Sequence, residues 1–547
     1  MATEERRSRY DLSMNDLADS QNLAAHGAAN DLACYQAMKA HDARFDGHFF
    51  VGVSSTHIYC RPVCRVKLPK FENCRFFDHA ALAESAGYRP CLRCRPELAP
   101  SSLPWTTSDA SRTLALQAAR WLDDPQAWQA NAPTHDDSKP SISQLAAHLG
   151  VSDRHVRRLF EAEFGVSPLQ YLQTRRLLKA KQLLTDTDLP IAQVAQCSGF
   201  GSVRRFSAAF LAHYQLNASQ LRRTTNRFNS PSTSPSSGYC TVKLSYRPPY
   251  DAPWLLTFFQ KRQVNAIEFV AIEANKLSAE WTLRLESGDI EHLGWLHIEF
   301  LPKQSAVQVQ VSDSLRDVLP QVIRQVRALL DLDADPMAIN AVLGDCFSGD
   351  ADKSTVEGLR VPGCLNGFEL AVRAILGQQV TVAAGRTFTQ RVVDTFGQPI
   401  TTPFPALTRL FPTPEVLAQA SGEDLGRLGI VKQRQAAITA LARAVAEKQL
   451  HLHPNTNIEA TMTTLRALPG VGDWTAQYIA MRALRWPDAF VAGDVALHKA
   501  MGLQHLEPPL SPTKTAAAAV AASQVWRPWR SYAVMRAWTS LSQKPST

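Results

Sequence analysis

Apolar residues recur with two different periods along this chain of 547 residues. Between residues 241 and 310 the runs WTLRLE, LHIEF and AVQVQV alternate apolar and polar side chains, which predicts half-buried strands, and one helix is expected near residues 254–262. From residue 315 to the end the apolar spacing is helical, with short turns rich in glycine and proline. The pattern therefore predicts an α+β segment followed by a helical one.

Two polar stretches divide the first half of the chain. Residues 122–141 have the composition of a loop between helices, and residues 224–238, TTNRFNSPSTSPSSG, contain almost no large apolar side chains and cannot bury a core. Several domains are expected at this length. We predict a multidomain α+β protein with these segments: a mobile N-terminus 1–30, a cysteine-rich α/β domain 31–97, an all-α domain 105–223, a linker 224–239, a mixed α+β subdomain 240–314 and a helical domain 315–541.

The composition of the chain limits the cellular locations and the binding partners that can be expected for the protein. No apolar run approaches the roughly 20 residues of a membrane span, and the first residues, MATEERRSRYDLSMNDLADSQ, lack the apolar core of a signal peptide. We therefore expect a cytoplasmic protein with no membrane partner. The net charge of +8 and the pI near 9.0 suit a polyanionic partner, although an ordinary solvated surface explains the charge equally well. In a reducing compartment, close cysteine pairs bind metal or react more often than they form disulfides.

Four cysteines form two close pairs, Cys60 with Cys64 and Cys91 with Cys94. Two such pairs can complete a tetrahedral sulfur site around Zn²⁺, and most sites of this kind are structural. From His57 to Arg95, however, the chain has eight Lys or Arg residues and only three Asp or Glu residues. A structural site that faces water does not need this excess, whereas a site that lies against phosphates does. The residues alone leave a structural and a reactive role open.

Two segments of the all-α domain repeat one scheme. Residues 141–165 and 189–214 each join two helices across a glycine turn, at Gly150 and Gly199, and residues 168–184 predict one connecting helix. Such a pair of helix-turn-helix units would place its second helices in successive major grooves. The alternative is a packing module whose arginines only face solvent. The predicted DNA contacts are Arg154, Arg157, Arg158, Ser202, Arg204 and Arg205. Of these, Arg154 and Arg204 are expected to contact base edges.

A further motif, LRALPGVGDWTAQYIAMRAL at residues 465–484, contains a Pro-Gly-Val-Gly turn between two helices. Such a hairpin leaves backbone N–H groups uncovered by side chains, so Gly470 and Gly472 are predicted to bind a DNA phosphate. Asp494 follows Gly472 by 22 residues, at an expected loop-to-helix junction. Most aspartates at such junctions are helix N-caps.

The cysteine block and the helix-turn-helix pair resemble two known families. The stretches ARFDGHFFVGVSSTHIYCRPVC, FENCRFF and GYRPCLRCRP are similar to the N-terminal domain of the Ada alkylation-response proteins. The resemblance implies that Cys60 accepts a methyl group from a methylated DNA phosphate while it remains a zinc ligand with Cys64, Cys91 and Cys94. Cys74 falls outside that pattern and is expected to be a core thiol. The tandem helix-turn-helix resembles the AraC-family domain, which implies promoter DNA and RNA polymerase as partners.

From residue 243 to residue 538 the chain resembles AlkA-type 3-methyladenine glycosylases of the helix-hairpin-helix superfamily. The stretches that carry the resemblance are LSYRPPYDAPWLLTFF, VPGCLNGFELAVRAILGQQVTVAAG, VGDWTAQYIA and WRPWRSYAVMRAW. It implies a catalytic carboxylate at Asp494, which would stabilise positive charge on the sugar as the glycosidic bond breaks, and a flipped base held by aromatic residues. The implied pocket residues are Trp474, Tyr478 and Trp538.

Departures from the family pattern refine the expected reaction. Superfamily members that also cut the strand have a lysine directly after the hairpin; this chain has Trp474 there, which implies base removal without strand cleavage. Members with an iron–sulfur cluster need four cysteines near the C-terminus, and no cysteine follows Cys364. Gln379 takes the gap-filling position where the family pattern has leucine, and Val495 replaces a tyrosine. The resemblance also implies a monovalent cation at hairpin carbonyls near Leu468.

Together these features predict one monomeric protein with three activities. It would accept methyl groups from DNA at Cys60, regulate promoters of the alkylation response, and hydrolytically excise alkylated bases such as 3-methyladenine from double-stranded DNA. The chain lacks a Pro-Cys-His-Arg motif, so the O6-methylguanine transferase domain of many Ada proteins is not expected. One alternative is a transcription factor or damage sensor whose glycosylase half binds but does not catalyse. Another is a repair enzyme whose front domains only tether it to DNA.

Overall fold

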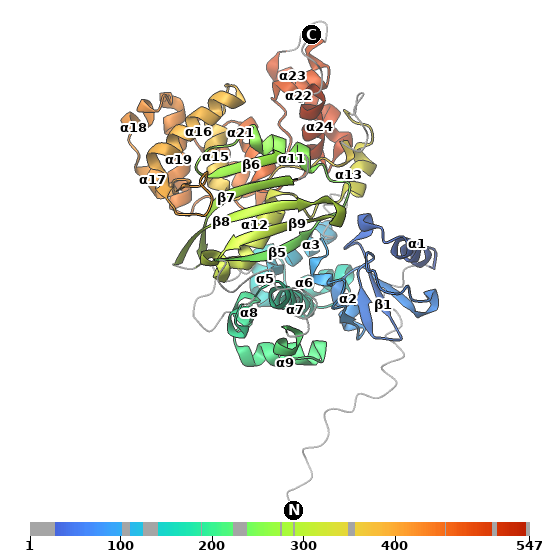
Figure 1. Ribbon diagram of the computed structural model, residues 1–547. Helices are drawn as coiled ribbons and strands as arrows, with labels where there is room; N and C mark the ends of the chain where they lie inside the picture. The colour runs from blue at the N-terminus through green and yellow to red at the C-terminus, as the bar shows by residue number, and fades with distance from the viewer. Residues whose placement is uncertain are drawn as a thin grey trace, which may run out of the picture.

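The computed structural model describes residues 28–542 except residues 101–109, 124–140, 188, 223–237, 274–275, 288–289, 348–355, 455 and 506–510. Most of the expected N-terminal segment and linker, and most of the loop expected at 122–141, lie outside the described residues. Figure 1 shows a cysteine-rich domain and a helical domain beside a central sheet, with the C-terminal helices on the other side. The predicted multidomain α+β class is confirmed. In the described ranges, no helix is both long enough and apolar enough to cross a membrane.

The cysteine-rich domain is a four-stranded sheet of order β3-β1-β2-β4. Strand β1 pairs antiparallel with β2 and β3, whereas β4 runs parallel to β2. Cys60 ends β2 and Cys91 follows β4 directly, so the parallel pair brings the two cysteine pairs to one end of the sheet. Cys74 begins β3 and is half-buried beside an aromatic cluster. The elements are α1 (Ala28–Lys39), β1 (Phe50–Val53), β2 (Ile58–Cys60), β3 (Cys74–Phe77), α2 (Ala80–Ser85) and β4 (Arg89–Pro90).

The all-α domain contains both predicted helix-turn-helix units. Their second helices, α6 and α9, begin after Ser152 and Ser202, whose hydroxyls accept backbone N–H groups of the first turn. The expected connecting helix is α7, and it is capped in the same way by Ser167. The first unit has its own core with α3, whereas the second unit shares a core with the central sheet. The helices are α3 (Ala110–Asp123), α5 (Ile142–Leu149), α6 (Asp153–Phe164), α7 (Pro168–Asp186), α8 (Ile191–Cys197) and α9 (Val203–Tyr214).

The central sheet is antiparallel and has five strands in the order β5-β9-β8-β7-β6. The three alternating runs seen in the sequence lie in β7, β8 and β9, and the expected helix at 254–262 is α11. Along β9 the residues 307, 309 and 311 are fully buried while 308 and 310 are not, as the two-residue period requires. The elements are β5 (Tyr239–Ser245), α11 (Ala252–Gln260), β6 (Glu268–Glu273), β7 (Lys276–Ser287), β8 (Ile290–Leu301), β9 (Ala306–Ser312) and α12 (Leu319–Leu329).

The C-terminal region is helical with one exception. Residues 398–410 were expected to follow the helical pattern, but β10 and β11 form a short antiparallel ladder there. Three prolines in this stretch remove backbone donors and prevent a helix. The elements are α13 (Pro336–Leu343), α15 (Gly367–Leu376), α16 (Val382–Phe396), β10 (Gln398–Pro399), β11 (Arg409–Leu410), α17 (Pro414–Gln419), α18 (Gly422–Arg427), α19 (Lys432–Ala446), α20 (Ile458–Ala467), α21 (Asp473–Arg482), α22 (Val495–Ala500), α23 (Pro512–Ala522) and α24 (Arg530–Ser542).

Buried ion pairs hold the cysteine-rich domain against α7. Lys181 of α7 is 1% exposed, pairs with Glu97, and donates to the carbonyl of Cys91 at 3.1 Å. Arg95 contacts Glu97 at 3.0 Å and Asp186 of α7 at 2.6 Å. Removing one partner of a buried pair leaves an uncompensated charge, which is strongly destabilising. These pairs therefore fix how the cysteine-rich domain lies on the helix-turn-helix domain.

Candidate functional site

The four cysteines meet in one cluster at the end of β2 and β4. Their Sγ atoms all lie within 4.8 Å of one another; Cys60, Cys64 and Cys91 are buried and Cys94 is partly buried. Four sulfurs around a tetrahedral Zn²⁺, each at about 2.3 Å, lie about 3.8 Å apart. The cluster therefore has the donor type, the number of donors and the spacing of a zinc site.

The four thiols are close enough to shift one another's pKa values. Contacts with the neighbouring thiols raise the pKa of Cys60 and lower the pKa values of Cys64 and Cys91, while burial raises that of Cys94. The backbone N–H groups of Arg61 and Arg93 donate to the sulfurs of Cys94 and Cys91, at 3.3 and 3.4 Å. Four thiolates at this spacing require a cation to offset their repulsion.

Two of the arginines that were expected to face phosphates pair with carboxylates inside the protein instead. Arg61 is 6% exposed and pairs with the buried carboxylate of Asp46, and Arg95 is held by its contacts to Glu97 and Asp186. Asp46 and Asp186 are distant from these arginines in the sequence, so residue spacing did not reveal them, whereas Glu97 lies only two residues from Arg95. The basic side chains of this segment that are exposed are Arg65, Lys67, Lys70, Arg75 and Arg93. The local excess of positive charge therefore serves both internal pairing and the outer surface.

The predicted contacts of the helix-turn-helix units are all on the surface. Arg154, Arg157 and Arg158 lie on the exposed face of α6, and Arg204 and Arg205 occupy the first turn of α9. Ser202 is exposed, but its hydroxyl accepts the N–H of Arg205 at 3.2 Å and caps α9. The arginines are thus free of the core and available to a DNA groove or backbone, and their DNA contacts stay a prediction.

The helix-hairpin-helix turn joins α20 to α21. Gly470 has φ +74°, a left-handed conformation that suits glycine, and Gly472 is the exposed N-cap of α21. Sequence reasoning missed Gln378, whose amide donates to the carbonyl of Gly470 and to the hydroxyl of Thr475, both at 2.9 Å. Its neighbour Gln379 is exposed with φ +52°, between α15 and α16. The residue expected to fill the gap in the duplex therefore stands next to a residue that braces the hairpin.

Asp494 is a helix N-cap and also the acceptor of two indole N–H groups. Its Oδ1 accepts the N–H of Leu497 at 2.7 Å, which caps α22, and the indole N–H of Trp538 at 3.0 Å. Its Oδ2 accepts the indole N–H of Trp474 at 3.0 Å. An ordinary N-cap needs only the first of these bonds. The other two fix the carboxylate between two aromatic rings.

The aromatic residues expected around a flipped base are adjacent. The rings of Trp474 and Tyr478 stack at 5.2 Å with 9° between their planes, and the ring of Trp538 lies 6.4 Å from that of Tyr478. The three rings and Asp494 line the same cleft. Side chains of this kind and geometry can hold a planar, cationic base beside a carboxylate.

Two arginines behind this wall were not found from the sequence. Arg482 donates to the hydroxyl of Tyr478 at 2.6 Å and to the carbonyls of Pro362 and Gly363. Burial raises the pKa of Tyr478, but Arg482 and Arg262 outweigh it and the pKa is lowered. Arg482 lies one helical turn beyond Tyr478, so the i, i+4 spacing contained a signal. Arg262 belongs to the α+β subdomain, and no local spacing predicts its contact.

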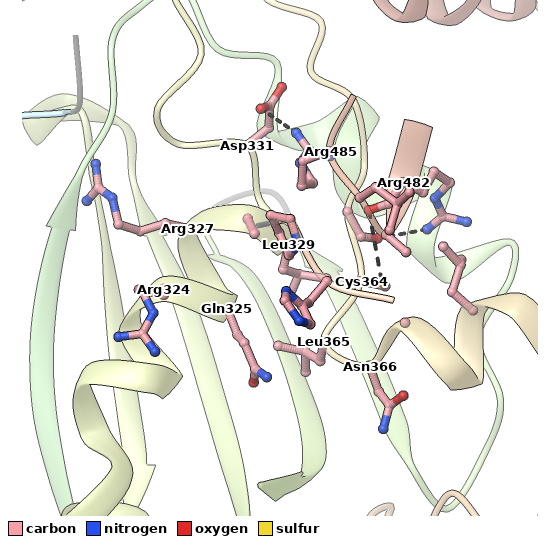
Figure 2. A pocket seen from close by; sticks show the side chains of 18 of the residues that line it. Arg324, Gln325, Arg327, Leu329, Asp331, Cys364, Leu365, Asn366, Arg482 and Arg485 are labelled. Atoms are coloured by element: carbon pink, nitrogen blue, oxygen red, sulfur yellow. Dashed lines mark hydrogen bonds and ion pairs between the residues drawn. The ribbon is translucent and has the colours of Figure 1, made fainter. Parts of the chain in front are cut away.

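The cleft extends beyond the aromatic wall to the boundary between the α+β subdomain and the C-terminal helices. Figure 2 shows this inner part, where Arg482 and Arg485 lie opposite side chains of α12, with the segment 364–366 between them. With a volume of about 1780 Å³, the cleft is larger than a single base requires. The base-binding region is therefore only part of a larger cavity.

Trp538→Phe tests the aromatic clamp on Asp494, because it keeps a ring and removes the indole N–H. A hydrogen bond to a charged group contributes about 1.5–3 kcal/mol, so we expect the single-turnover rate of base release from alkylated DNA to fall by about tenfold. The matched control is Trp526→Phe, since Trp526 packs on Phe347 and Phe490 away from Asp494. Equal rates for both variants would mean that the indole N–H does not position Asp494.

Four family models match successive parts of the chain. They are the metal-binding domain of Ada (residues 33–97), a helix-turn-helix domain (145–224), the AlkA N-terminal domain (241–366) and the HhH-GPD superfamily of base excision DNA repair proteins (372–525). The thiol cluster, the tandem helix-turn-helix and the hairpin followed by Asp494 thus define a zinc-containing, DNA-binding repair protein. Zn²⁺ as cofactor and double-stranded DNA as partner are confirmed at this level.

The chain belongs to the family of bifunctional AlkA proteins, which join an Ada-type metal-binding domain to a glycosylase domain. It is 36% identical over 514 residues to a probable bifunctional transcriptional activator/DNA repair enzyme AlkA of Mycobacterium tuberculosis, covering 93% of this chain and 96% of the relative. It is 31% identical over 304 residues to DNA-3-methyladenine glycosylase 2 of Escherichia coli, covering 55% of this chain and 98% of that protein. Its match to the Ada protein of Escherichia coli is 30% over 150 residues, covering 27% of this chain and 37% of that protein.

Proposed function

We propose that this protein repairs alkylated DNA by two chemistries and regulates transcription of the alkylation response. It hydrolyses the glycosidic bond of bases such as 3-methyladenine without cutting the strand, and it takes methyl groups from DNA phosphotriesters onto Cys60. The observation that supports the first activity is the position of Asp494. Its carboxylate accepts two indole N–H groups in an aromatic cleft, and Asp494 follows the predicted DNA-binding hairpin in the chain. The four-thiol cluster carries the second.

Base release depends on the charge of the sugar and of the base, the two groups that the breaking bond joins. The base leaves with the electron pair of the glycosidic bond, and the carboxylate of Asp494 stabilises the positive sugar and orients the attacking water. Flipping the base out costs a few kcal/mol. Stacking against Trp474 and Tyr478 favours a cationic alkylpurine over a normal base by about 0.5–2 kcal/mol. Trp474 also occupies the position where a lysine would form a Schiff base, which supports release without strand cleavage.

Methyl transfer depends on a sulfur that is a thiolate at neutral pH. Cys60, Cys64, Cys91 and Cys94 would hold Zn²⁺, which would supply this state by lowering the thiol pKa. The Sγ of Cys60 attacks the methyl carbon, the carbon–oxygen bond breaks, and the phosphodiester leaves with the electron pair. A methyl phosphotriester has no negative charge, so a thiolate can approach it without repulsion. The thioether product has no easy way back, so each chain reacts once.

Regulation rests on the two helix-turn-helix units. We assign promoter DNA to α6 and α9, RNA polymerase as a further partner, and a monomer as the working state. The exposed arginines at the start of each recognition helix support this assignment. A monovalent cation at the hairpin near Leu468 remains part of the proposal.

Arg204→Ala tests the promoter contact. If the side chain reads a base edge, its loss should cost about 1–3 kcal/mol of discrimination between the promoter and random duplex. Binding to random duplex should change little. Competition binding at fixed salt measures both. Arg443→Ala, an exposed arginine of α19 in the glycosylase half, is the control. Equal weakening on both duplexes would assign Arg204 to the phosphate backbone instead.

The whole proposal is tested by two assays on the same purified protein. One measures release of 3-methyladenine from methylated DNA, and the other measures methyl transfer to the protein from an oligonucleotide with one methyl phosphotriester. Binding without base release would identify a damage sensor. Both activities without induction of a reporter gene by a methylating agent would identify a repair enzyme whose front domains only tether it.

A further inference from the structure

Arg247 is a buried arginine that joins three distant segments of the chain. It is 1% exposed and is the second residue after β5. Its Nε donates to the carbonyl of Asp46 at 2.8 Å, and one terminal nitrogen donates to the carbonyl of Pro100 at 3.2 Å. The other terminal nitrogen donates to the carbonyl of Asp333 at 2.9 Å. One guanidinium therefore ties the cysteine-rich domain to the loop that follows α12.

On one side, Arg247 connects to the thiol cluster through two residues, Asp46 and Arg61. The carboxylate of Asp46, 2% exposed, accepts the Nε–H of Arg61 at 2.8 Å. Arg61 follows the methyl acceptor Cys60 in the chain; its backbone N–H donates to the Sγ of Cys94 at 3.3 Å and its guanidinium to the carbonyl of Cys94 at 3.1 Å. The position of Asp46 is thus linked to the charge on the sulfurs.

The chain beside Asp46 is tightly packed against Pro100 of the front half and against Arg247 of the other half. Gly47 has φ +81°, and a Cβ there would lie 2.2 Å from the carbonyl oxygen of Pro100 and 3.1 Å from a terminal nitrogen of Arg247. Only glycine fits this conformation and this space. The contact between Asp46 and Arg247 therefore joins a tightly packed backbone carbonyl to a buried side chain, not two flexible surface side chains.

On the other side, the loop held by Arg247 anchors both helices of the base pocket. Asp331, near Asp333 in this loop, pairs with Arg485, as Figure 2 shows, and accepts the hydroxyl of Tyr532 at 2.8 Å. Arg485 follows α21, which carries Trp474 and Tyr478. Tyr532 belongs to α24, which carries Trp538. A shift of this loop would therefore displace α21 and α24, and with them Trp474, Tyr478 and Trp538.

We propose that Arg247 is a positioning residue that couples the thiol cluster to the base pocket, so that methylation of Cys60 slows base release. Methylation removes one negative charge from the sulfurs and adds a methyl group at a buried atom. Both changes weaken the contacts between Arg61 and Cys94. Arg61 then shifts Asp46, and Arg247 transmits this shift to the loop at residues 331–334. The inference rests on the proposed function, since it needs Cys60 as the acceptor.

The experiment uses the zinc-loaded full chain before and after reaction with an oligonucleotide that carries one methyl phosphotriester. Mass spectrometry reports the added methyl group, and single-turnover release of 3-methyladenine from a separate duplex reports the pocket. We expect methylation to slow release by about threefold or more in the wild-type protein. Arg247→Gln should release the base at one rate whether or not it is methylated.

Three further variants make the result specific. Asp46→Asn breaks the pair with Arg61 and leaves the carbonyl contact, so it should also remove the effect of methylation; it replaces Arg247→Gln if that variant fails to fold. Arg247→Lys keeps the charge and should retain part of the effect. His48→Gln removes a separate polar contact across this boundary, His48 to Asp335 at 3.3 Å, and should behave as wild type.

The outcomes separate this inference from the proposed function. Loss of methyl transfer or of base release in the unmodified wild type would count against the function itself. Equal release rates before and after methylation, with both activities intact, would overturn the coupling alone. A wild-type response in Arg247→Gln would overturn the role of Arg247.

Discussion

Asp494→Asn is expected to lower the single-turnover rate of base release by about a hundredfold or more. Asparagine caps helices as well as aspartate does, and its carbonyl oxygen can keep the bonds from Leu497 and Trp538, so α22 should stay in place. What is lost is the negative charge beside the sugar and the bond from Trp474, because the NH2 group cannot accept the indole N–H that Oδ2 accepts. Release of 3-methyladenine from alkylated duplex DNA, measured with enzyme in excess, gives the rate directly.

The matched control is Asp251→Asn, because Asp251 caps α11 through the N–H of Trp254 at 2.9 Å. That change alters an N-cap aspartate outside the aromatic clamp and should leave the rate within about twofold of wild type. Similar losses in both variants would show that Asp494 acts through stability. Full activity of Asp494→Asn would show that the carboxylate charge is not needed.

Cys60→Ser is expected to abolish methyl transfer from phosphotriester DNA. A serine hydroxyl is not ionised at neutral pH and is a poor ligand for zinc, so the nucleophile and one metal ligand disappear together. Incubation with an oligonucleotide that carries one methyl phosphotriester, followed by mass spectrometry of the protein, detects the transferred group.

Cys74→Ser is the control, since Cys74 belongs to the same domain and lies outside the cluster, with its thiol donating to the carbonyl of Lys70 at 3.3 Å. It should still gain one methyl group per chain. A methylated Cys60→Ser protein would move the acceptor to another cysteine, and Cys64, Cys91 and Cys94 would then be changed in turn.

Features encoded by neighbouring residues could be predicted from the sequence. The alternating run at 306–311 became β9, and the serine and glycine signals around 152 and 165 begin and end α6. The four cysteines meet because β2 and β4 pair in parallel, a pairing that the sequence did not reveal although the two close cysteine pairs did indicate a shared site. The roles of Cys60 and Asp494 stay predictions until they are measured.

Features that depend on distant partners could not be predicted. Arg61 was grouped with phosphate-facing residues because its partner Asp46 is not adjacent in any local pattern. Arg262 and Arg247 come from the α+β subdomain, yet they act on Tyr478 and on the loop after α12. Val495, which replaces a tyrosine of the family pattern, is 68% exposed beside Asp494. Because this side chain faces solvent, its effect on which bases the protein accepts depends on its contacts with DNA.

The missing side chain at Gly47 has a consequence for how such proteins can be recombined. Because a single added methyl group there would overlap the carbonyl oxygen of Pro100 in the front module and crowd a terminal nitrogen of Arg247, it would disturb the contact between the front module and the excision module. A chimera that grafts this sensor onto a foreign glycosylase would need the glycine on one partner and the arginine on the other. Without both residues, the two modules would be joined by the chain but would lack this packed contact.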